Sequence, residues 1–280
     1  MIIGHDKQKE YFQNVIKNNA LSHAYLFTGV DMIGKRTFAL ELARMINGRE
    51  MIDDPDFRLI APKVSDGESK IHIEDSRLLK SFFYLKPYSG PYKICIIDGA
   101  HSLTAEAANA LLKIVEEPPL FSILILVTSM PGLVLPTISS RCEEVRFLPA
   151  DNQLIEKHIS ENKKVKKEDR DFMIKLAGGR MGLLNNLMED GSLASAKKSI
   201  DDLRKLLSSG IFERIDFAKK IHEKGDYQPR IDYWLTWVSA HLRQSPKNEK
   251  IVKNLILLSS IVSQPQYNHR LALENFLLNL

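Results

Sequence analysis

The sequence predicts an α/β domain with a parallel sheet, followed by a wholly helical region. Three short apolar runs, at 24–27, 94–97 and 123–127, are typical of parallel strands buried on both faces. Segments with a helical spacing of apolar residues lie between these runs, and no convincing strand pattern occurs after Pro149. Strands that alternate with helices favour a parallel sheet covered by helices on both faces.

Helices are expected on either side of the first strand. Apolar residues at helical spacing predict one helix over 5–20 and another over 37–45, with the strand AYLF at 24–27 between them. The stretch 47–70 is polar and interrupted by Gly and Pro, so it predicts no regular element. A helix over 75–84 comes next, with its apolar residues on one side.

The second half of the α/β domain continues the alternation. A strand over 93–98 leads to a helix that Thr104 is expected to cap and that ends before Pro118. Strands are predicted over 123–127 and 145–148. We therefore expect three parts in the chain, an α/β domain over 1–148, a small helical domain over 149–192 and a helical domain over 193–280.

Composition sets broad limits on function. The 280 residues carry a net charge of +4, which permits contact with nucleic acid without establishing it. The only two cysteines, Cys95 and Cys142, lie in or beside apolar runs, and buried free thiols are expected there rather than a zinc site. The N-terminus lacks a signal-peptide pattern, and no apolar run is long enough to span a membrane, so we expect a cytoplasmic protein without a membrane partner.

A degenerate phosphate loop follows the first strand. The stretch GVDMIGKRT at 29–37 matches the pattern G-x-x-x-x-G-K at Gly29, Gly34 and Lys35. Arg36 stands where the pattern requires a Ser or Thr hydroxyl for Mg²⁺, and Thr37 comes one residue late, which is a rotation of about 100° on a helix. The loop either holds a nucleotide weakly or is a strand-to-helix turn that no longer binds one.

A second motif ends the strand over 93–98. A buried strand that delivers a carboxylate, here Asp98, is a common way to hold Mg²⁺ beside a phosphate. In many ATPases an acidic residue follows and helps to activate water, but Gly99 occupies that position here. The sequence alone leaves open whether the chain hydrolyses a nucleotide, only holds one, or does neither.

Several motifs in order resemble the AAA+ subunits of bacterial DNA polymerase III clamp loaders, in particular the delta-prime type. They are the runs SHAYLFTG at 22–29, DDPDFRLIAP at 53–62, KPYSGPYKICIIDGAHSLTAEAANALLKIVEEPP at 86–119, LPTISSRCEEVRF at 135–147 and NHRLALENFLLNL at 268–280. The resemblance implies an AAA+ module over 1–148, a helical lid over 149–192 and a helical collar over 193–280. It also implies assembly into a hetero-pentamer that loads a sliding clamp on primed DNA.

The resemblance implies a role in trans for Arg141, the arginine of the Ser-Arg-Cys motif. Delta-prime subunits typically do not hydrolyse ATP but offer this arginine to the ATP site of a neighbour. A guanidinium always carries its charge and can bind phosphate oxygens bidentately, which suits that role. The alternative is an ordinary ion pair of Arg141 with Glu143, Glu144 or a helix end.

The positions that would act in cis depart from the family pattern. Thr128 or Ser129 stands where the family keeps a phosphate-sensing residue, or forms a plain strand-end turn. In the lid, Met181 stands at the place of a second sensing arginine, with Arg180 one position early. The zinc module of many relatives is absent, so we expect no metal site and no required cofactor, with ATP and Mg²⁺ at most weakly bound. The degenerate nucleotide site is assigned to Gly29, Gly34, Lys35, Thr37, Asp98 and Thr128.

Two other functions stay open. An active clamp-loader ATPase would use Thr37 for Mg²⁺ and a remote group to position water. A nucleotide-binding regulator unrelated to replication would not assemble with clamp-loader subunits.

Overall fold

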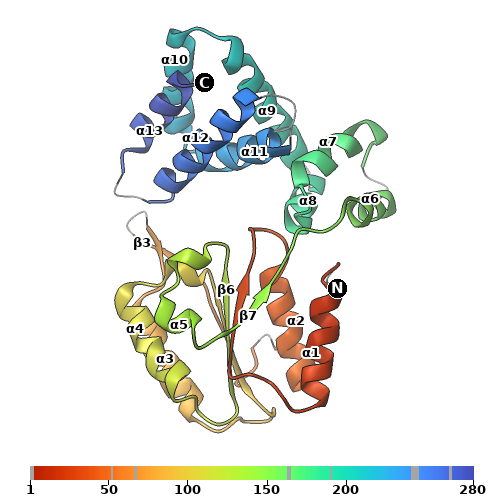
Figure 1. Cartoon of the computed structure of the whole chain (residues 1–280), viewed down its shortest axis with the longest axis vertical. Helices are drawn as coiled ribbons and strands as arrows, with labels where there is room; N and C mark the ends of the chain where they lie inside the picture. Colours follow the sequence, from red (N-terminus) through yellow and green to blue (C-terminus); the bar gives the residue numbers. More distant parts are fainter. Residues whose placement is uncertain are drawn as a thin grey trace. The chain divides into compact units, whose positions relative to one another are not determined.

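The computed structural model describes residues 3–51, 53–65, 68–162, 165–189, 191–240, 246–264 and 267–280. The chain divides into two compact units, Met1–Ala150 and Asp151–Leu280. Figure 1 shows a sheet with helices in the first unit and only helices in the second. The predicted further division of the second unit at residue 192 stays a prediction.

A five-stranded parallel sheet forms the centre of the first unit. The strand order is β2-β5-β6-β1-β7, and every neighbouring pair is parallel. Since the strands are parallel, their carboxyl ends lie at one edge of the sheet, where ligands of such folds bind. The strands are β1 (Ala24–Thr28), β2 (Phe57–Ile60), β5 (Lys93–Asp98), β6 (Ser122–Thr128) and β7 (Glu143–Arg146).

Helices cover both faces of this sheet, each over its own apolar core. One core joins Phe12, Phe27 and Phe38, and the other joins Leu26 and Leu111 with further buried residues of the opposite face. Figure 1 shows α1 and α2 on one side of the sheet and α3, α4 and α5 on the other. These helices are α1 (Asp6–Lys17), α2 (Lys35–Asn47), α3 (Ile73–Tyr84), α4 (Ala105–Glu116) and α5 (Pro136–Ser139).

The elements that the sequence failed to predict are short and peripheral. The stretch 47–70 holds β2 and the antiparallel hairpin β3 (Lys63–Ser65) and β4 (Glu68–Lys70). The sequence did not predict β2 because it has only four residues, lies at a sheet edge and includes the charged Arg58. Single-turn helices η1 (Ala100–Ser102) and η2 (Pro131–Leu133) complete the unit. The last strand covers 143–146 rather than 145–148. Its first two residues, Glu143 and Glu144, are exposed, so the apolar pattern of the sequence did not include them.

The described part of the second unit is helical throughout, as expected from the absence of strand patterns after Pro149. Trp234 is fully buried there and donates from its indole N–H to the carbonyl of Ser199 at 2.8 Å. In the part of the chain that the structure describes, no helix is long and apolar enough to cross a membrane. The helices are α6 (Asn152–Glu161), α7 (Lys167–Ala177), α8 (Met181–Met188), α9 (Ser192–Ser208), α10 (Ile211–Lys224), α11 (Tyr227–Ala240), α12 (Pro246–Val262) and α13 (His269–Leu278).

Candidate functional site

The loop between β1 and α2 has the backbone of a phosphate loop. Gly29 and Gly34 both have positive φ, 144° and 105°. A Cβ on Gly29 would lie 2.5 Å from the carbonyl oxygen of Phe147, so only glycine fits this close approach. His5 supports the loop from α1, because its Nε2 lies 2.8 Å from the carbonyl of Ile33.

Lys35 is folded back onto this loop. Its ammonium donates to the carbonyls of Gly29 at 2.6 Å and Val30 at 2.7 Å, and the residue is only 5% exposed. Burial lowers the pKa of Lys35, while the carboxylates of Asp31 and Asp98 raise it in part. The ammonium therefore donates hydrogen bonds to carbonyls of its own loop. From the same position, the lysine of a phosphate loop would reach the outer phosphates.

Arg36 pairs with the strand-end carboxylate. Its Nη1 lies 3.5 Å from Oδ2 of Asp98. Thr37 is exposed in the first turn of α2, and no contact with Asp98 is found for it among the described residues. Asp98 and Thr37 are thus not brought together as Mg²⁺ ligands, because the carboxylate of Asp98 contacts the guanidinium of Arg36 instead.

Gly99 has a backbone conformation that disfavours an acidic residue, which would stand at this position in an active ATPase. Its φ is 78°, and a Cβ would lie 3.0 Å from Cγ of Pro62. A glutamate at this position would combine left-handed backbone strain with a tight contact. The backbone around Asp98 therefore favours glycine at position 99.

Thr128 lies at the correct edge of the sheet but is internally bonded. The register pairs it with Thr28, directly before the phosphate loop. Its buried hydroxyl accepts from the backbone N–H of Met130 at 3.0 Å and lies 3.1 Å from Nδ1 of His101. Burial lowers the pKa of His101, whose contact with Thr128 the sequence did not reveal. Ser129 follows with a buried hydroxyl oxygen that has no hydrogen-bond partner in the described structure.

Arg141 lies just after α5 and is held by weak, exposed contacts. Its guanidinium donates to the carbonyl of Thr137 at 2.9 Å and lies 3.1 Å from a carboxylate oxygen of Glu116. The side chains of Arg141 and Glu116 are 41% and 45% exposed. The helix-end contact was one of the expected alternatives, but the carboxylate partner is Glu116 rather than Glu143 or Glu144.

The position expected for a second phosphate-sensing arginine, in the second unit, holds a buried apolar residue. Met181 is 6% exposed at the start of α8. The preceding residue, Arg180, donates to the carbonyl of Ala177 and to the hydroxyl of Thr236, both in the second unit. The structure thus ties this arginine to its own helical unit.

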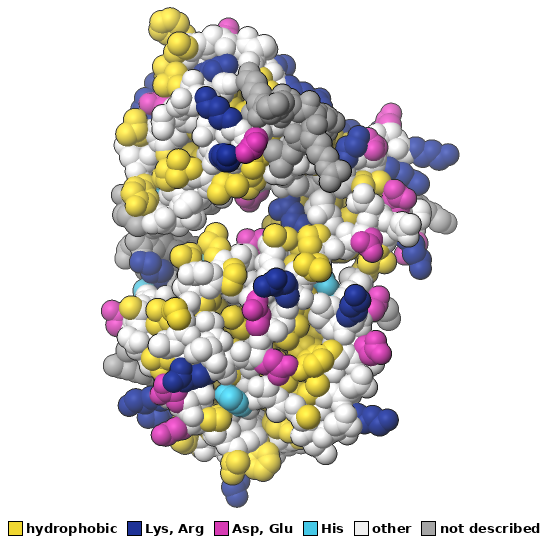
Figure 2. Space-filling model, viewed as in Figure 1, with side chains coloured by type: hydrophobic (Ala, Val, Ile, Leu, Met, Phe, Trp, Pro, Cys, Tyr) yellow, Lys and Arg dark blue, Asp and Glu magenta, His cyan; other side chains and the backbone are white. Residues whose placement is uncertain are grey.

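Charged side chains of both signs occur together on one face of the first unit. Figure 2 shows Lys and Arg side chains interspersed with Asp and Glu on the visible face of the first unit. In the described residues no group of three His, Cys, Asp or Glu side chains could hold a metal ion. At this edge of the sheet Arg36 contacts Asp98 and Gly99 follows it, where the phosphate-site pattern has a hydroxyl and an acidic residue.

Comparison with known proteins identifies the family. A family model described as "DNA polymerase III, delta subunit" matches residues 4–151, which is more than half of the chain. The chain belongs to this family. Its predicted place among the DNA polymerase III clamp-loader subunits is thereby confirmed, as is the AAA+ fold with a mostly helical C-terminal region.

Individual relatives agree with this membership in the clamp-loader family. DNA polymerase III subunit delta' of Bacillus subtilis is 35% identical over 164 residues, which cover 53% of this chain and 49% of that protein. Subunit tau of the same organism is 27% identical over 276 residues, 91% of this chain and 48% of that protein. The chain thus spans about half the length of these curated relatives or less, since it covers 25% of the tau/gamma subunit of Haemophilus influenzae.

A solved structure shows the same fold. A DNA polymerase III gamma-subunit-related protein of Thermotoga maritima superposes with a TM-score of 0.59, covering 95% of this chain and 97% of that chain at 20% identity. This similarity in fold covers both units of the chain.

Proposed function

We propose that the chain is a delta-prime-type clamp-loader subunit that does not hydrolyse ATP by itself and supplies Arg141 to the ATP site of a neighbouring subunit. The observation that carries the proposal is the Arg36–Asp98 pair, at 3.5 Å, in the place where an active subunit holds Mg²⁺. The guanidinium of Arg141, which follows α5, is 41% exposed, so a partner can reach it.

The groups that would act in cis support this proposal together. Lys35 bonds loop carbonyls, Arg36 contacts the strand-end carboxylate, and Gly99 leaves no base beside it. Arg36 and Gly99 each replace a group that phosphoryl transfer requires, namely a metal ligand and a base that activates water, while Lys35 is retained. No step of ATP hydrolysis is assigned to this chain's own loop, and no cofactor is required by the proposal.

The contacts of Arg141 support a role in trans. An ion pair between two exposed side chains contributes about 0–1 kcal/mol, so Glu116 holds the guanidinium loosely. The charged oxygens of a neighbour's ATP can displace such a contact, and bidentate bonds from a guanidinium are strong. An arginine supplied across an interface stabilises the charge of the transition state and is worth about 10³-fold or more in rate.

The proposed partners follow from family membership. We expect assembly with the other clamp-loader subunits in a hetero-pentamer, and indirect action on a sliding clamp and on primed DNA in the cytoplasm. On the face that Figure 2 shows, the charges are interspersed, and we assign no direct DNA contact to it.

Reconstitution tests the proposal. Arg141→Ala should leave the assembly of the complex intact, as measured by gel filtration, while ATP turnover at the neighbour's site falls by about 10³-fold. Arg146→Ala is the matched control, since Arg146 is exposed in β7 and pairs only weakly with Glu144 at 3.7 Å. Unchanged hydrolysis and clamp loading with Arg141→Ala would contradict the assignment.

The alternative is an active clamp-loader ATPase. Its support is the retention of Lys35 and Asp98 at the same edge of the sheet. Steady-state ATP hydrolysis by the isolated chain, abolished by Lys35→Ala, would favour this alternative over the proposed function.

A further inference from the structure

A groove lies beside the edge strand β2 in the first unit. It has a cavity volume of about 910 Å³ and is formed by β2, α3 and the loop that precedes β5. None of the residues that line it belongs to the phosphate loop or to the contacts of Arg141. The lining residues that bear on the argument are Arg58, Leu59, Leu78, Leu85, Lys86 and Tyr88.

Large apolar side chains of this groove are exposed. Leu78 and Leu85 of the α3 region are 70% and 65% exposed, and Tyr88 in the following loop is 82% exposed. Leu59 of β2 is 36% exposed. Apolar side chains gathered around one concavity are typical of a binding surface, whereas single apolar residues scattered over a protein surface are ordinary.

The described charged residues of the groove all carry the same sign. Arg58, Lys86 and Lys93 line it, and no carboxylate does so among the described residues. Lys93 is neutralised by Asp56, whose carboxylate lies 3.3 Å away, and its ammonium lies 4.4 Å from the centre of the Phe82 ring. The accessible charge of the groove therefore comes from Arg58 and Lys86.

The strand beside the groove has a free edge. β2 ends the strand order and pairs with β5, and no other described strand pairs with its outer edge. Alternate N–H and C=O groups along such an edge can pair with an extended peptide. Phe57 already donates its N–H to the carbonyl of Asp54 and accepts from Arg58 at its own carbonyl, so Leu59 is the residue of β2 that offers main-chain groups to an occupant.

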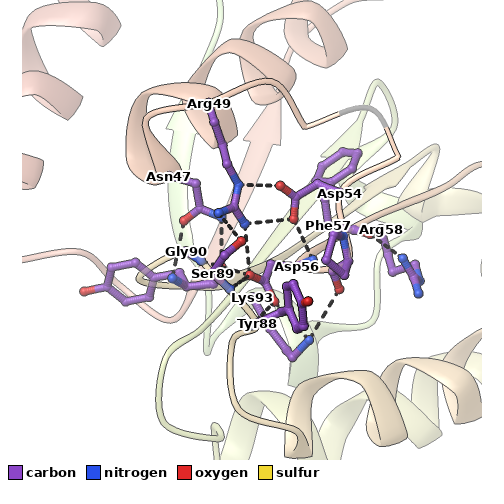
Figure 3. Close-up of polar contacts among 12 residues, drawn as sticks. Asn47, Arg49, Asp54, Asp56, Phe57, Arg58, Tyr88, Ser89, Gly90 and Lys93 are labelled. Atoms are coloured by element: carbon purple, nitrogen blue, oxygen red, sulfur yellow. Dashed lines mark hydrogen bonds and ion pairs between the residues drawn. The ribbon is translucent and has the colours of Figure 1, made fainter.

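A buried ionic network fixes the far wall of the groove. Asp56 is fully buried and accepts hydrogen bonds from the backbone N–H groups of Tyr88 at 2.6 Å, Ser89 at 2.9 Å and Gly90 at 3.0 Å. Arg49 adds a contact to the same carboxylate at 3.0 Å. Figure 3 shows these groups converging on Asp56 from the loop that carries Tyr88. The loop is therefore pre-organised, which reduces the entropy lost on binding.

We infer that this groove binds an extended acidic segment of a partner protein. Leucine-like side chains of the segment lie against Leu59, Leu78 and Leu85, and its carboxylates face Arg58 and Lys86. Nucleic acid fits less well, because two accessible cations amid leucines do not follow a phosphate backbone. This surface shares no residue with the proposed role of Arg141, so either proposal can fail without the other.

Selection from random decapeptides displayed on phage, with the full-length chain immobilised, tests the inference. The selected peptides should share acidic residues next to large apolar ones. In fluorescence anisotropy a labelled selected peptide should bind the chain, and Leu78→Ser or Lys86→Glu should weaken binding at least about tenfold, or about 1.4 kcal/mol.

Two matched variants separate the groove from general surface effects. Leu120→Ser changes a leucine that is 83% exposed outside the groove, and Lys80→Glu reverses a charge on α3 that does not line it. Both should bind the peptide as the wild type does, and circular dichroism checks that all four variants are folded. The inference is overturned if the selected peptides show no acidic bias or bind the two groove variants undiminished. Displacement of the peptide by single-stranded oligodeoxythymidylate, with tighter binding of the oligonucleotide, overturns it in favour of nucleic acid.

Discussion

The guanidinium of Arg36 lies 3.5 Å from the carboxylate of Asp98 at the end of a buried strand. This carboxylate is the one that a nucleotide-hydrolysing relative of this fold would offer to Mg²⁺. Because the two side chains are 52% and 28% exposed, the pair adds little to stability. Its consequence is functional, since a cation fixed to the chain competes with a metal ion for the same oxygens.

Arg36→Thr should restore magnesium-dependent nucleotide binding. The change places a hydroxyl where the phosphate-loop pattern has one and frees Asp98. We expect the affinity for ATP with Mg²⁺ to rise at least about tenfold over the wild type, a gain of about 1.4 kcal/mol. Titration of a fluorescent ATP analogue with MgCl₂ or with EDTA measures this. Arg44→Thr, at an exposed position in the same helix, is the control, and equal affinity of the wild type and Arg36→Thr would count against the interpretation.

Gly99→Glu should destabilise the first unit without creating an ATPase. Left-handed backbone strain at a non-glycine residue costs about 1–2 kcal/mol, and the 3.0 Å approach of Pro62 adds to it. Urea unfolding followed by circular dichroism measures the loss. Gly132→Glu is the matched control, because a Cβ there meets nothing within 4 Å. If Gly99→Glu is as stable as this control and hydrolyses ATP, the backbone does not exclude the base.

The sequence predicted the site residues that lie at the ends of strands. Gly29, Asp98 and Thr128 follow or end buried strands, and a parallel sheet brings such positions to one edge. The same reasoning could not find the partners of long side chains. Arg141 reaches Glu116, which ends a different helix, and no periodicity encodes this contact.

The missed parts of the fold have a common physical cause. β2 is short and lies at the sheet edge, so its apolar residues do not form a continuous run. The network of Asp56 joins it to backbone N–H groups more than thirty residues away, which hydrophobic patterning cannot detect. The sequence signals available for this network are the third aspartate of the run DDPDF at 53–57 and the glycine-containing turn at 88–90.

Arg141→Lys should fail to replace the arginine in the reconstituted complex. Lysine keeps the positive charge but cannot form two parallel hydrogen bonds to phosphate oxygens. We expect assembly at the wild-type level and ATP turnover at the neighbour's site closer to that of Arg141→Ala than to the wild type. Glu116→Gln serves as the comparison, since loss of an exposed pair should change the free energy of unfolding by less than about 1 kcal/mol. Wild-type turnover with lysine would show that charge alone is enough.

Asp56→Ala should destabilise the first unit in a pH-dependent way. Burial alone would raise the pKa of Asp56, but its hydrogen bonds from Ser89, Tyr88 and Gly90 and its contact with Lys93 outweigh burial and hold the pKa well below its usual range. A carboxylate whose pKa is lower in the folded than in the unfolded chain stabilises the fold above the unfolded pKa of about 3.9, and this contribution is lost as the pH falls below it.

The expected loss at pH 7 is about 3–5 kcal/mol, because removal of Asp56 leaves the buried Lys93 without its carboxylate. The difference between wild type and Asp56→Ala should shrink as the pH falls below about 4. Urea unfolding at pH 7 and pH 3 measures it by circular dichroism, since both tryptophans, Trp234 and Trp237, lie in the second unit. Glu50→Ala removes an exposed carboxylate of the first unit and should change stability little at either pH. A difference that is the same at both pH values would mean that Asp56 acts through packing rather than through its charge.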